Sequence, residues 1–250
     1  MQFDNQTILI TGAASGIGAA VATRLANSGA RKLILVDRDE GRVRDFAFSL
    51  PCERALIIGD VADPELWRAA DLTGLTNAVV NAGIASSGPI DTLELDEWRR
   101  IMTVNLDGAF LTLQAAMRAI GSAGGGSIVV TASAAGLKAE RGIAAYAASK
   151  AGVIQLARVA AKEGAAQGIR VNAIAPGGVE TPIWDAVPMF TDLAEKVGRE
   201  AAFAEMAAMA TPLKRYAKAE EIAAQIAFLL SDECATVTGT VFVSDGGYTV

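Results

Sequence analysis

Seven short apolar runs alternate along this chain with longer stretches of helical character, and this alternation restricts the fold more than any other feature. The runs are rich in β-branched residues and comprise Thr7–Thr11, Lys32–Val36, Ala55–Ile58, Asn77–Val80, Ser127–Thr131, Ile169–Ala175 and Thr240–Val243. Apolar strands that are separated by helices form parallel sheets whose two faces are both covered. The sequence therefore predicts an α/β fold with a doubly wound parallel sheet of about seven strands.

Helices are expected between these strands and on both faces of the sheet. The expected helices are Ile17–Ser28, Asp39–Ser49, a short one at Pro64–Ala70, a long one at Asp96–Ile120, and Ala144–Gly164. No linker rich in Pro, Gly or Ser and no internal repeat divides the 250 residues. We therefore expect a single domain that comprises residues 1–250.

One segment, at about residues 179–213, departs from the alternation after the sixth strand. It contains aromatic and Met residues among Ala and acidic residues, with helical spacing near Glu200–Met209. Open α/β sheets bind ligands at the carboxyl ends of their strands. The segment is therefore either a substrate-binding insertion or a pair of surface helices that packs its Met and Phe side chains inward.

Composition argues against several classes of protein. The formal net charge is −6 and no basic cluster is present, which disfavours nucleic-acid binding. No apolar run is long enough to cross a bilayer and the N-terminus lacks a signal-like segment, so we expect a cytoplasmic protein without a membrane partner. The chain has no His and only two distant Cys residues, Cys52 and Cys234, so we expect no metal site.

A Gly-rich turn joins the first strand to the first helix. Its sequence, TGAASGIG, places Gly12, Gly16 and Gly18 in a Gly-x-x-x-Gly-x-Gly spacing, with Ser15 and Ile17 between them. Glycines at such positions permit a tight turn and a close approach of the backbone to a diphosphate at the helix N-terminus. Because the turn follows a strand and opens a helix, the sequence predicts a dinucleotide site here.

The second strand ends at Asp37, in the sequence LILVDRD. A carboxylate at this position accepts hydrogen bonds from a ribose diol and repels a 2′-phosphate, which favours NAD(H) over NADP(H). Two alternatives remain: Arg38 follows directly and is able to bind a phosphate, and Asp37 is able to act as a helix N-cap. The cofactor expected from the sequence is NAD(H).

Acid–base chemistry in this chain needs a side chain other than His. In the stretch TASAAGLKAERGIAAYAASK, Tyr146 and Lys150 are four residues apart and share one face of a helix, and Ser133 lies upstream. An ammonium beside a phenol favours the phenolate, so the tyrosine becomes an acid or base at moderate pH. A Tyr and a Lys at this spacing also occur by chance in helices, so the pair alone does not identify an active site.

Further motifs occur in order along the chain. They are GDVAD at residues 59–63, VNAG at 80–83, MTVNLDGAF at 102–110, PGGVETP at 176–182 and VSDGGYTV at 243–250. Together with the Gly-rich turn and with Ser133, Tyr146 and Lys150, they resemble the motifs of the short-chain dehydrogenase/reductase family over essentially the whole chain. The resemblance implies a Rossmann fold and the NAD(P)-dependent oxidoreduction of an alcohol or ketone.

The resemblance also implies a role for each matching residue. Tyr146 would exchange the proton with the substrate, Lys150 would favour the phenolate and hold the nicotinamide ribose, and Ser133 would bind the substrate oxygen. Asn105 would hold a water near Lys150, a role compatible with a structural one. Cofactor contacts are implied for Asp60, Val61, Asn81, Ala82, Gly83, Tyr146, Lys150, Pro176, Gly177, Val179 and Thr181.

Two departures from the pattern of the family are visible in the sequence. Val80 replaces the first Asn of the NNAG motif, at a position expected to pack in the interior and not to affect catalysis. The segment between Asp60 and Asn81 is shorter than usual, so the helix within it is expected to be truncated. In the family this region flanks the subunit interface, so the shortening bears on assembly.

The predicted function is NAD(H)-dependent interconversion of a secondary alcohol and a ketone. Two alternatives remain open: an NADPH-dependent 3-oxoacyl-[acyl-carrier-protein] reductase, and a non-catalytic protein that senses nucleotides. The substrate is expected to be a fairly apolar, bulky ketone or secondary alcohol, because the candidate pocket residues are largely apolar; these are Ile84, Ala85, Ser86, Ser133, Trp184, Met189, Phe190, Met206 and Met209. A polyol or sugar is the alternative, since the loop backbone is able to supply hydrogen bonds. The resemblance implies a homotetramer.

Overall fold

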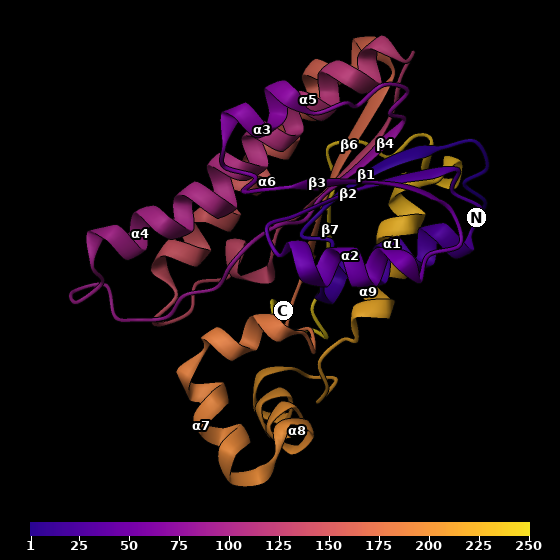
Figure 1. Cartoon of the computed structure of the whole chain (residues 1–250). Coiled ribbons are helices and arrows are strands. Elements are labelled where there is room, and N and C mark those ends of the chain that lie inside the picture. Colours follow the sequence, from indigo (N-terminus) through magenta and orange to yellow (C-terminus); the bar gives the residue numbers. More distant parts are fainter.

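The computed structural model describes residues 1–250 and contains one seven-stranded parallel sheet between two layers of helices (Figure 1). The strands are β1 (Thr7–Thr11), β2 (Lys32–Asp37), β3 (Glu53–Ile58), β4 (Asn77–Val80), β5 (Gly126–Thr131), β6 (Ile169–Pro176) and β7 (Val241–Ser244). Their order in the sheet is β3-β2-β1-β4-β5-β6-β7, so the winding changes direction between β1 and β4. The predicted doubly wound Rossmann sheet is confirmed.

The helices divide between the two faces of the sheet (Figure 1). One layer consists of α1 (Gly16–Asn27), α2 (Glu40–Phe48) and α9 (Ala219–Leu230). The other layer consists of α3 (Pro64–Ala69), α4 (Leu95–Met102), α5 (Gly108–Ser122) and α6 (Ala144–Gly164). None of the helices is both long enough and apolar enough to cross a membrane.

The side chains of the strands alternate between two buried cores. In β1, Ile8 and Ile10 belong to the core under α1, α2 and α9, whereas Leu9 belongs to the core under α5 and α6. All five residues of β1 are buried, because helices cover both faces of the sheet. This double burial explains why the strands are continuous apolar runs in the sequence and do not alternate between apolar and polar residues.

The long helix expected at Asp96–Ile120 is interrupted in the structure. α4 and α5 join through one π-helical turn at Thr103–Asp107, and this turn carries Asn105. The prediction of a continuous α-helix is wrong for these five residues. The sequence did not reveal the π turn, because one wider turn hardly changes the spacing of apolar residues. Single π turns within α-helices often occur at functional sites.

α9 was not among the elements expected from the sequence. Its residues Ile222, Ile226 and Leu229 are buried in the core that α9 shares with α1. At its start, the Glu221 carboxylate accepts a hydrogen bond of 2.9 Å from the Lys218 backbone N–H. The apolar residues of α9 recur at spacings of three and four, so the pattern itself does indicate this helix.

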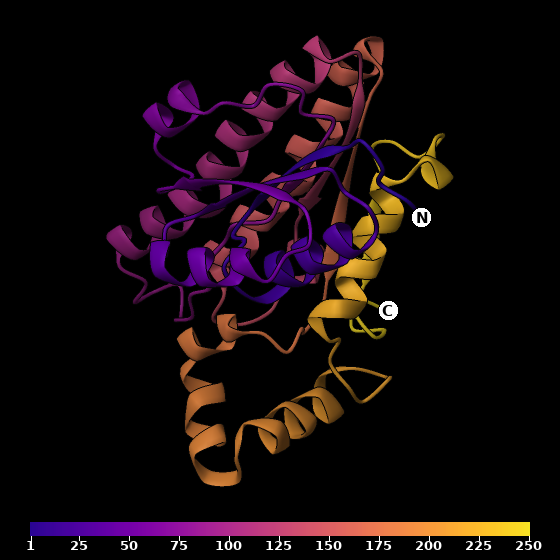
Figure 2. The same ribbon diagram turned by 45° about the vertical axis from the view of Figure 1, so that its right-hand side comes forward.

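The segment that follows β6 forms a helical lobe that stands away from the sheet (Figure 2). It contains a 3₁₀ turn (Pro182–Ala186), α7 (Pro188–Val197) and α8 (Arg199–Ala210). The aromatic rings of Trp184, Phe190, Phe203 and Tyr216 form the core of the lobe, with neighbouring ring centres 4.5 to 6.4 Å apart. Rings at these separations attract one another beyond their hydrophobic burial, so the lobe has a core of its own.

The helix between β3 and β4 is short, as the sequence predicted. α3 comprises only six residues, and none of them is fully buried. The indole N–H of Trp67 donates a hydrogen bond of 2.8 Å to the Val61 carbonyl oxygen, which fastens the short helix to the loop after β3. Val80 is 3% exposed and packs in the core under α5 and α6, so its position is an interior one.

Candidate active site

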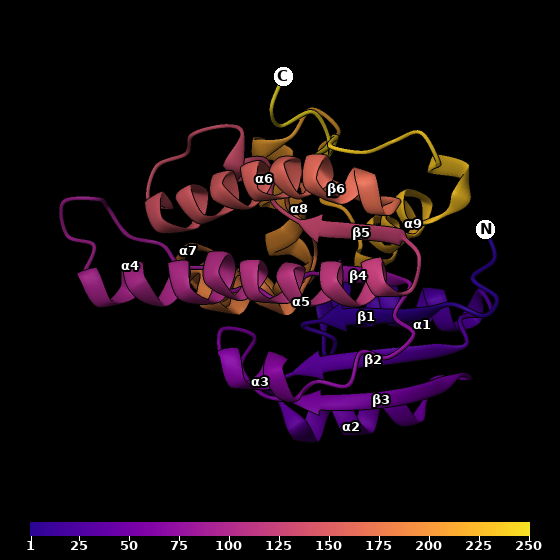
Figure 3. The ribbon, with the colours of Figure 1, turned by 90° about the horizontal axis from the view of Figure 1, so that it is seen from above.

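A cavity of about 1160 Å³ is lined by the loops at the carboxyl ends of the strands and by the helical lobe. The arrowheads of β2, β3 and β5 point the same way in Figure 3, so the loops after the strands gather at this edge. Most predicted site residues line the cavity: Gly12, Ser15, Gly16, Ile17, Asp37, Arg38, Asp60, Val61, Asn81, Ala82, Gly83, Ile84, Ala85, Ser86, Ser133, Tyr146, Lys150, Pro176, Gly177, Val179, Thr181, Trp184, Met189, Met206 and Met209. The exceptions are Gly18, Asn105 and Phe190.

Hydrogen bonds from Thr11 join the two strands at which the winding changes direction. The Thr11 Oγ1 atom accepts from the backbone N–H groups of Asn81, at 2.9 Å, and Ala82, at 3.0 Å. The Asn81 side chain in turn donates to the Thr11 carbonyl oxygen at 3.0 Å. The loops after β1 and β4 are therefore held together at the place where doubly wound sheets bind dinucleotides.

The Gly-rich turn after β1 is compact because its glycines have no Cβ. Gly12 and Gly16 have φ values of +65° and +52°, in the left-handed region that favours glycine. A Cβ on Gly18 would lie 2.0 Å from the Gly12 carbonyl oxygen. Gly18 was predicted to contact the cofactor, but in the structure it allows α1 to pack closely against the turn.

The N-terminus of α1 borders the cavity, and no capping side chain accepts a hydrogen bond from its first backbone N–H groups. Ser15 at the N-cap forms no side-chain cap hydrogen bond, and no acidic residue occurs in the first turn. The first N–H groups of a helix lack intrahelical partners and carry a partial positive charge. This end of α1 therefore fits the diphosphate of a dinucleotide.

Asp37 is held in place at the end of β2. Its Oδ2 atom accepts a hydrogen bond of 2.9 Å from the Ala14 backbone N–H, and its Oδ1 atom accepts one of 3.0 Å from the Asp39 backbone N–H. A carboxylate accepts more hydrogen bonds than these two, so both oxygens keep free capacity toward the cavity. The helix cap of α2 is Asp39, whose Oδ1 accepts from the Arg42 N–H.

Lys150 is buried without a carboxylate partner. The residue is 4% exposed, and its Nζ atom donates a hydrogen bond of 2.9 Å to the Thr131 carbonyl oxygen. Burial disfavours the charged form and lowers the pKa of Lys150 to about 8. An ammonium has three N–H donors, so Lys150 retains donors that suit the hydroxyl groups of a ribose.

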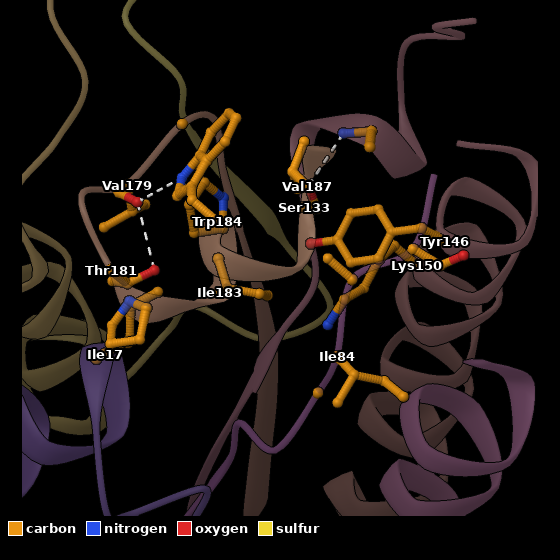
Figure 4. Close-up of a pocket in the computed structure, with 18 of the residues that line it drawn as sticks. Ile17, Ile84, Ser133, Tyr146, Lys150, Val179, Thr181, Ile183, Trp184 and Val187 are labelled. Atoms are coloured by element: carbon orange, nitrogen blue, oxygen red, sulfur yellow. Dashed lines mark hydrogen bonds between the residues drawn. The ribbon is translucent and has the colours of Figure 1, made fainter. Parts of the chain in front are cut away.

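Tyr146 lies one helical turn before Lys150 and borders the same cavity (Figure 4). The Lys150 Nζ atom is 5.8 Å from the centre of the Tyr146 ring. Burial raises the pKa of Tyr146 above its usual value, and a hydrogen bond with Ser133 acts in the opposite direction. In the chain alone, the cost of burying the phenolate outweighs the stabilisation by its neighbours. The expected lowering of this pKa refers to the enzyme with an oxidised cofactor bound, and it stays a prediction.

Ser133 follows β5 and presents its hydroxyl group to the cavity. Its Oγ atom accepts a hydrogen bond of 3.2 Å from the Ala135 backbone N–H, because Ser133 is the N-cap of a 3₁₀ turn. Since the oxygen accepts from the backbone, the hydroxyl proton remains free to be donated. Ser133 is therefore suited to donate a hydrogen bond to Tyr146 or to a substrate oxygen.

Asn105 does not line the cavity but holds one of its walls. Its Oδ1 atom accepts a hydrogen bond of 2.8 Å from the Ile84 backbone N–H, and its Nδ2 atom donates to the Ile84 carbonyl oxygen at 3.0 Å. The Nδ2 atom also donates to the Ser149 Oγ atom at 3.2 Å. The π turn that carries Asn105 therefore fastens the loop after β4 to α6, which bears Tyr146 and Lys150.

The space beside Lys150 stays open because residue 83 is a glycine. A Cβ on Gly83 would lie 3.4 Å from the Lys150 Nζ atom and 3.3 Å from the Asn105 Oδ1 atom. The Thr131 Oγ1 atom is buried, borders the cavity and has no hydrogen-bond partner in the chain. Polar groups with free hydrogen-bonding capacity, on Lys150 and Thr131, therefore lie beside open space. The polar part of a bound dinucleotide would need both the space and these hydrogen-bond partners.

The other end of the cavity is lined by apolar side chains (Figure 4). Ile84 borders it from the loop after β4, and Ile183, Trp184 and Val187 border it from the lobe. The Trp184 indole is fixed by a hydrogen bond of 2.9 Å from its Nε1 atom to the carbonyl oxygen of Val179. This end suits an apolar molecule better than a densely charged one.

Phe190 was predicted to line the substrate pocket, but it lies in the core of the lobe. Its side chain is fully buried, and its ring centre is 4.5 Å from that of Phe203. Trp184, Met189 and Met206 in the same segment do border the cavity. The lobe therefore has one face toward the aromatic core, as the inward-packing interpretation predicted, and another toward the cavity. Its role as a substrate-binding insertion stays a prediction.

Several residues that line the cavity were not expected from the sequence. Thr131 is the last residue of β5 and lies two residues before Ser133, in extended backbone, so the alternation of side chains along such a segment was a local signal for it. Tyr216 and Tyr248 come from the loop after α8 and from the C-terminal tail. No local pattern indicates these two tyrosines, because only the folded chain brings them to the cavity.

The fold and the site together define the class of the protein. The sheet is a Rossmann sheet with a Gly-rich turn at its change of winding, and the buried Lys150 and the half-buried Tyr146 line the same cavity. This is the arrangement of a dinucleotide-dependent oxidoreductase. The residues present fit the nicotinamide dinucleotide that this class uses.

Known proteins narrow the class further. A family model described as enoyl-(acyl carrier protein) reductase matches residues 12–249. The chain is 40% identical to cis-4-hydroxycyclohexanecarboxylate dehydrogenase of Sinomonas cyclohexanicum, over 99% of this chain and 98% of the relative. It is 37% identical to cyclohexanol dehydrogenase of Acinetobacter sp. (strain SE19), over 99% of this chain and 96% of the relative. The crystal structure of carveol dehydrogenase from Mycobacterium avium in complex with NAD matches with a TM-score of 0.91 and 29% identity. The match covers 99% of this chain and 98% of that one.

The chain belongs to the short-chain dehydrogenase/reductase family. It is an oxidoreductase of the kind that interconverts secondary alcohols and ketones with a nicotinamide dinucleotide. The predicted family and reaction type are confirmed.

Proposed function

We propose that the chain is an NAD(H)-dependent dehydrogenase of an apolar, cyclic secondary alcohol, and that residues 179–213 are its substrate-binding segment. The observation that carries the proposal is the occurrence of Tyr146 and the unpaired Lys150 in one cavity whose far end is apolar. Two relatives are named for the dehydrogenation of cyclohexanol and hydroxycyclohexanecarboxylate, which supports a ring alcohol as the substrate.

Tyr146 is the proton carrier in this proposal. When bound, the nicotinamide supplies the hydride chemistry. The ordinary pKa of a tyrosine is about 10 and burial raises that of Tyr146 further, so Tyr146 holds a proton that it is able to donate to the ketone oxygen during reduction. Ser133 donates a hydrogen bond to the same oxygen and stabilises the negative charge that develops there. In alcohol oxidation, the proton moves back to Tyr146.

Lys150 holds the ribose and assists Tyr146. Its Nζ atom has one partner in the chain, the Thr131 carbonyl oxygen, and its remaining donors are free. The positive charge of Lys150 is present below a pH of about 8, where it favours the phenolate that forms when Tyr146 donates its proton. Asn105 acts as a positioning residue, because it holds α6 against the loop after β4.

A screen of alcohols tests the proposed activity directly. The purified chain would be incubated with NAD and cyclic, linear, polyol and hydroxy-acid alcohols, and NADH formation would be followed by absorbance. We expect ring alcohols to have the highest kcat/KM, because the apolar end of the cavity rewards the burial of hydrocarbon. NADH binding without turnover of any alcohol would support a nucleotide-sensing protein and contradict the proposal.

We further propose that Asp37 makes NAD(H) the preferred cofactor. The carboxylate is fixed by the N–H groups of Ala14 and Asp39 and keeps free acceptor capacity at the cavity. A ribose diol would donate to it, whereas a 2′-phosphate would be repelled. Arg38 also borders the cavity and is the residue that would favour NADP(H).

Substitution of Asp37 by Asn is expected to weaken the preference for NAD. The amide keeps the shape and one acceptor but loses the charge, so the ratio of kcat/KM for NADP over NAD should rise about tenfold to a hundredfold. Steady-state kinetics with both cofactors measure this ratio. The matched Arg38→Gln variant should change the ratio in the opposite direction. Equal use of both cofactors by the unsubstituted chain would contradict the assignment.

A 3-oxoacyl-[acyl-carrier-protein] reductase is the second candidate, because the matching family model is described by an acyl-carrier-protein substrate. An acidic carrier protein docks on basic residues, whereas this chain has a net charge of −6. Reduction of an acetoacetyl thioester with NADPH would be compared with reduction of cyclohexanone with NADH. We expect the cyclic ketone and NADH to give the higher kcat/KM.

We also propose that the chain forms a homotetramer through two separate apolar surfaces. Leu95 and Phe110 are exposed on α4 and α5, and Phe228 and Val243 are exposed on α9 and β7. Two different self-complementary surfaces combine into a closed assembly of four copies. Single apolar residues are common on the surface of any protein, so the mass of the protein in solution is the measurement that tests the tetramer.

Light scattering after gel filtration is expected to give four times the chain mass of 25.8 kDa. Substitution of Phe110 by Glu should place charges in one of the two interfaces and reduce the mass to that of a dimer. The matched control is Phe48→Glu, since Phe48 is 77% exposed at the end of α2. A monomeric mass for the unsubstituted chain would rule out the assembly.

A further inference from the structure

The C-terminal tail, residues 245–250, extends from the end of β7 to the cavity. In Figures 1 and 2 the marked C-terminus lies level with the junction between the sheet and the lobe. Tyr248 lines the cavity, together with Glu140 and Arg141 from the loop that precedes α6. The tail is therefore part of the wall of the cavity, although none of the proposed catalytic residues belongs to it.

Three side chains fasten the tail to the loop before α6, and we call Lys138, Glu140 and Tyr248 the tail clasp. The Lys138 Nζ atom donates a hydrogen bond of 2.5 Å to the Tyr248 carbonyl oxygen and lies 4.4 Å from the centre of the Tyr248 ring. The Tyr248 hydroxyl donates to the Glu140 Oε2 atom at 3.0 Å. Burial and the Glu140 carboxylate raise the pKa of Tyr248 to about 12, so its hydroxyl remains a donor at neutral pH.

The tail is itself shaped so that Tyr248 is held in place. The Asp245 carboxylate accepts hydrogen bonds from the Gly247 N–H at 2.9 Å and from the Thr249 N–H at 2.8 Å. The Gly246 carbonyl oxygen accepts from the Leu213 N–H at 3.1 Å, which ties the tail to the loop after α8. The tail therefore bridges the lobe and the loop before α6.

The loop that the clasp fastens lies between two of the proposed catalytic residues. Ser133 precedes it and Tyr146 follows it, whereas the clasp contacts only its middle part. Its other side is fixed by a hydrogen bond of 2.7 Å from the Gly88 N–H to the Gly142 carbonyl oxygen. The clasp is thus able to change the width of the cavity without contacting the reacting groups.

We propose that the tail clasp closes the substrate end of the cavity and that Tyr248 thereby determines which alcohols the enzyme accepts. The inference rests on the proposed alcohol dehydrogenase function. With the clasp closed, the Tyr248 ring limits the cavity to compact ring alcohols. Lys138 and Glu140 are exposed to solvent, where water competes for their hydrogen bonds with Tyr248, so the clasp is able to open for substrate entry.

Kinetics with two alcohols test the selectivity. Cyclohexanol is the compact probe, and borneol, a bicyclic secondary alcohol, is the bulky one. In Tyr248→Ala and in a chain without residues 248–250, kcat/KM for cyclohexanol should fall about tenfold through KM, and kcat/KM for borneol should rise about tenfold. The control is a chain without Val250 alone, since that residue is fully exposed. An unchanged ratio between the two alcohols would overturn the proposal.

The polar contacts of the clasp are tested separately from the ring. Tyr248→Phe keeps the ring and removes the bond to Glu140, and Lys138→Met removes the ammonium. Both variants should change the ratio of kcat/KM between borneol and cyclohexanol in the same direction as Tyr248→Ala, but by less. The dissociation constant of NADH, from its fluorescence, should stay within about twofold, because none of the three clasp residues is among the predicted cofactor contacts. A change in NADH affinity as large as the change in the selectivity ratio would show that the whole cavity has loosened. That result would contradict a role of the clasp in substrate selection.

Hydrogen exchange provides a measurement that does not depend on turnover. The Gly136, Leu137 and Lys138 N–H groups are hydrogen-bonded to the carbonyl oxygens of Ser133 and Ala134. In Lys138→Met and Tyr248→Ala these amides should exchange faster, whereas deletion of Val250 should leave them unchanged. Unchanged exchange would disprove the clasp. Faster exchange in a chain that oxidises no alcohol would confirm the clasp and refute the dehydrogenase function.

Discussion

Substitution of Tyr146 by Phe is expected to lower kcat for alcohol oxidation and ketone reduction by about a thousandfold, with little change in NADH affinity. Phe keeps the ring that packs beside Lys150 but has no proton to exchange with the substrate oxygen. The loss of a positioned acid or base typically costs this much. Steady-state kinetics would measure the rate, and NADH fluorescence would measure binding.

The change from Tyr to Phe at Tyr216 provides a matched control. Tyr216 stacks on Trp184 in the core of the lobe, with ring centres 5.3 Å apart. The Tyr216→Phe variant should keep kcat within a few-fold of the unsubstituted chain. Near-normal turnover by Tyr146→Phe with NAD bound would show that another group carries the proton.

Substitution of Lys150 by Met is expected to abolish most of the activity and yet to stabilise the fold at neutral pH. The loss of the proposed ribose donor and of the charge beside Tyr146 should lower kcat/KM by about a hundredfold or more. The buried ammonium also opposes folding, because burial lowers the pKa of Lys150 from 10.5 to about 8. A shift of this size corresponds to about 3 kcal/mol, less the cost of leaving the Thr131 carbonyl oxygen without its partner.

The effect of Lys150 on stability should depend on pH in a defined direction. Below pH 8, Lys150 is charged in both the folded and the unfolded chain, so the full cost of its burial is present. Between about pH 8 and 10.5 the unfolded chain binds more protons than the folded one, so the free energy of unfolding of the unsubstituted chain rises with pH. Met does not titrate, so the stability advantage of Lys150→Met should shrink across this window.

Urea denaturation of both chains at pH 7 and pH 10 measures this dependence. Lys162→Met is the matched control, because Lys162 lies on the same helix and is exposed to solvent. We expect the control to unfold like the unsubstituted chain at both pH values. A stability difference for Lys150→Met that is the same at both pH values would show that burial of its charge does not matter.

The strands were predictable because their burial on both faces leaves a simple signal. Each of the seven strands lies within two residues of its expected bounds, since an apolar, β-branched run of this length suits a covered parallel strand. Helix details were less predictable. The π turn at Thr103–Asp107 leaves the apolar spacing nearly unchanged, and its presence depends on the bonds that Asn105 makes with Ile84 and Ser149.

The candidate site was predictable where its residues are neighbours in the sequence. The Gly-rich turn is a local structure, and Tyr146 and Lys150 share a helix face by spacing alone. Phe190 shows where this reasoning stops, because its spacing suits both the cavity and the lobe core. The packing of Phe203 against it decides between the two.

The sequence by itself determined the succession of the seven strands along the chain, the Gly-rich turn, and the spacing of Tyr146 and Lys150, because each depends on residues within a few positions of one another. Only the tertiary structure decided that burial raises the pKa of Tyr146, and that Tyr248 borders the cavity. Burial depends on all the segments that surround a group, and Tyr248 lies more than 100 residues from Glu140. Such properties arise only when distant parts of the chain meet.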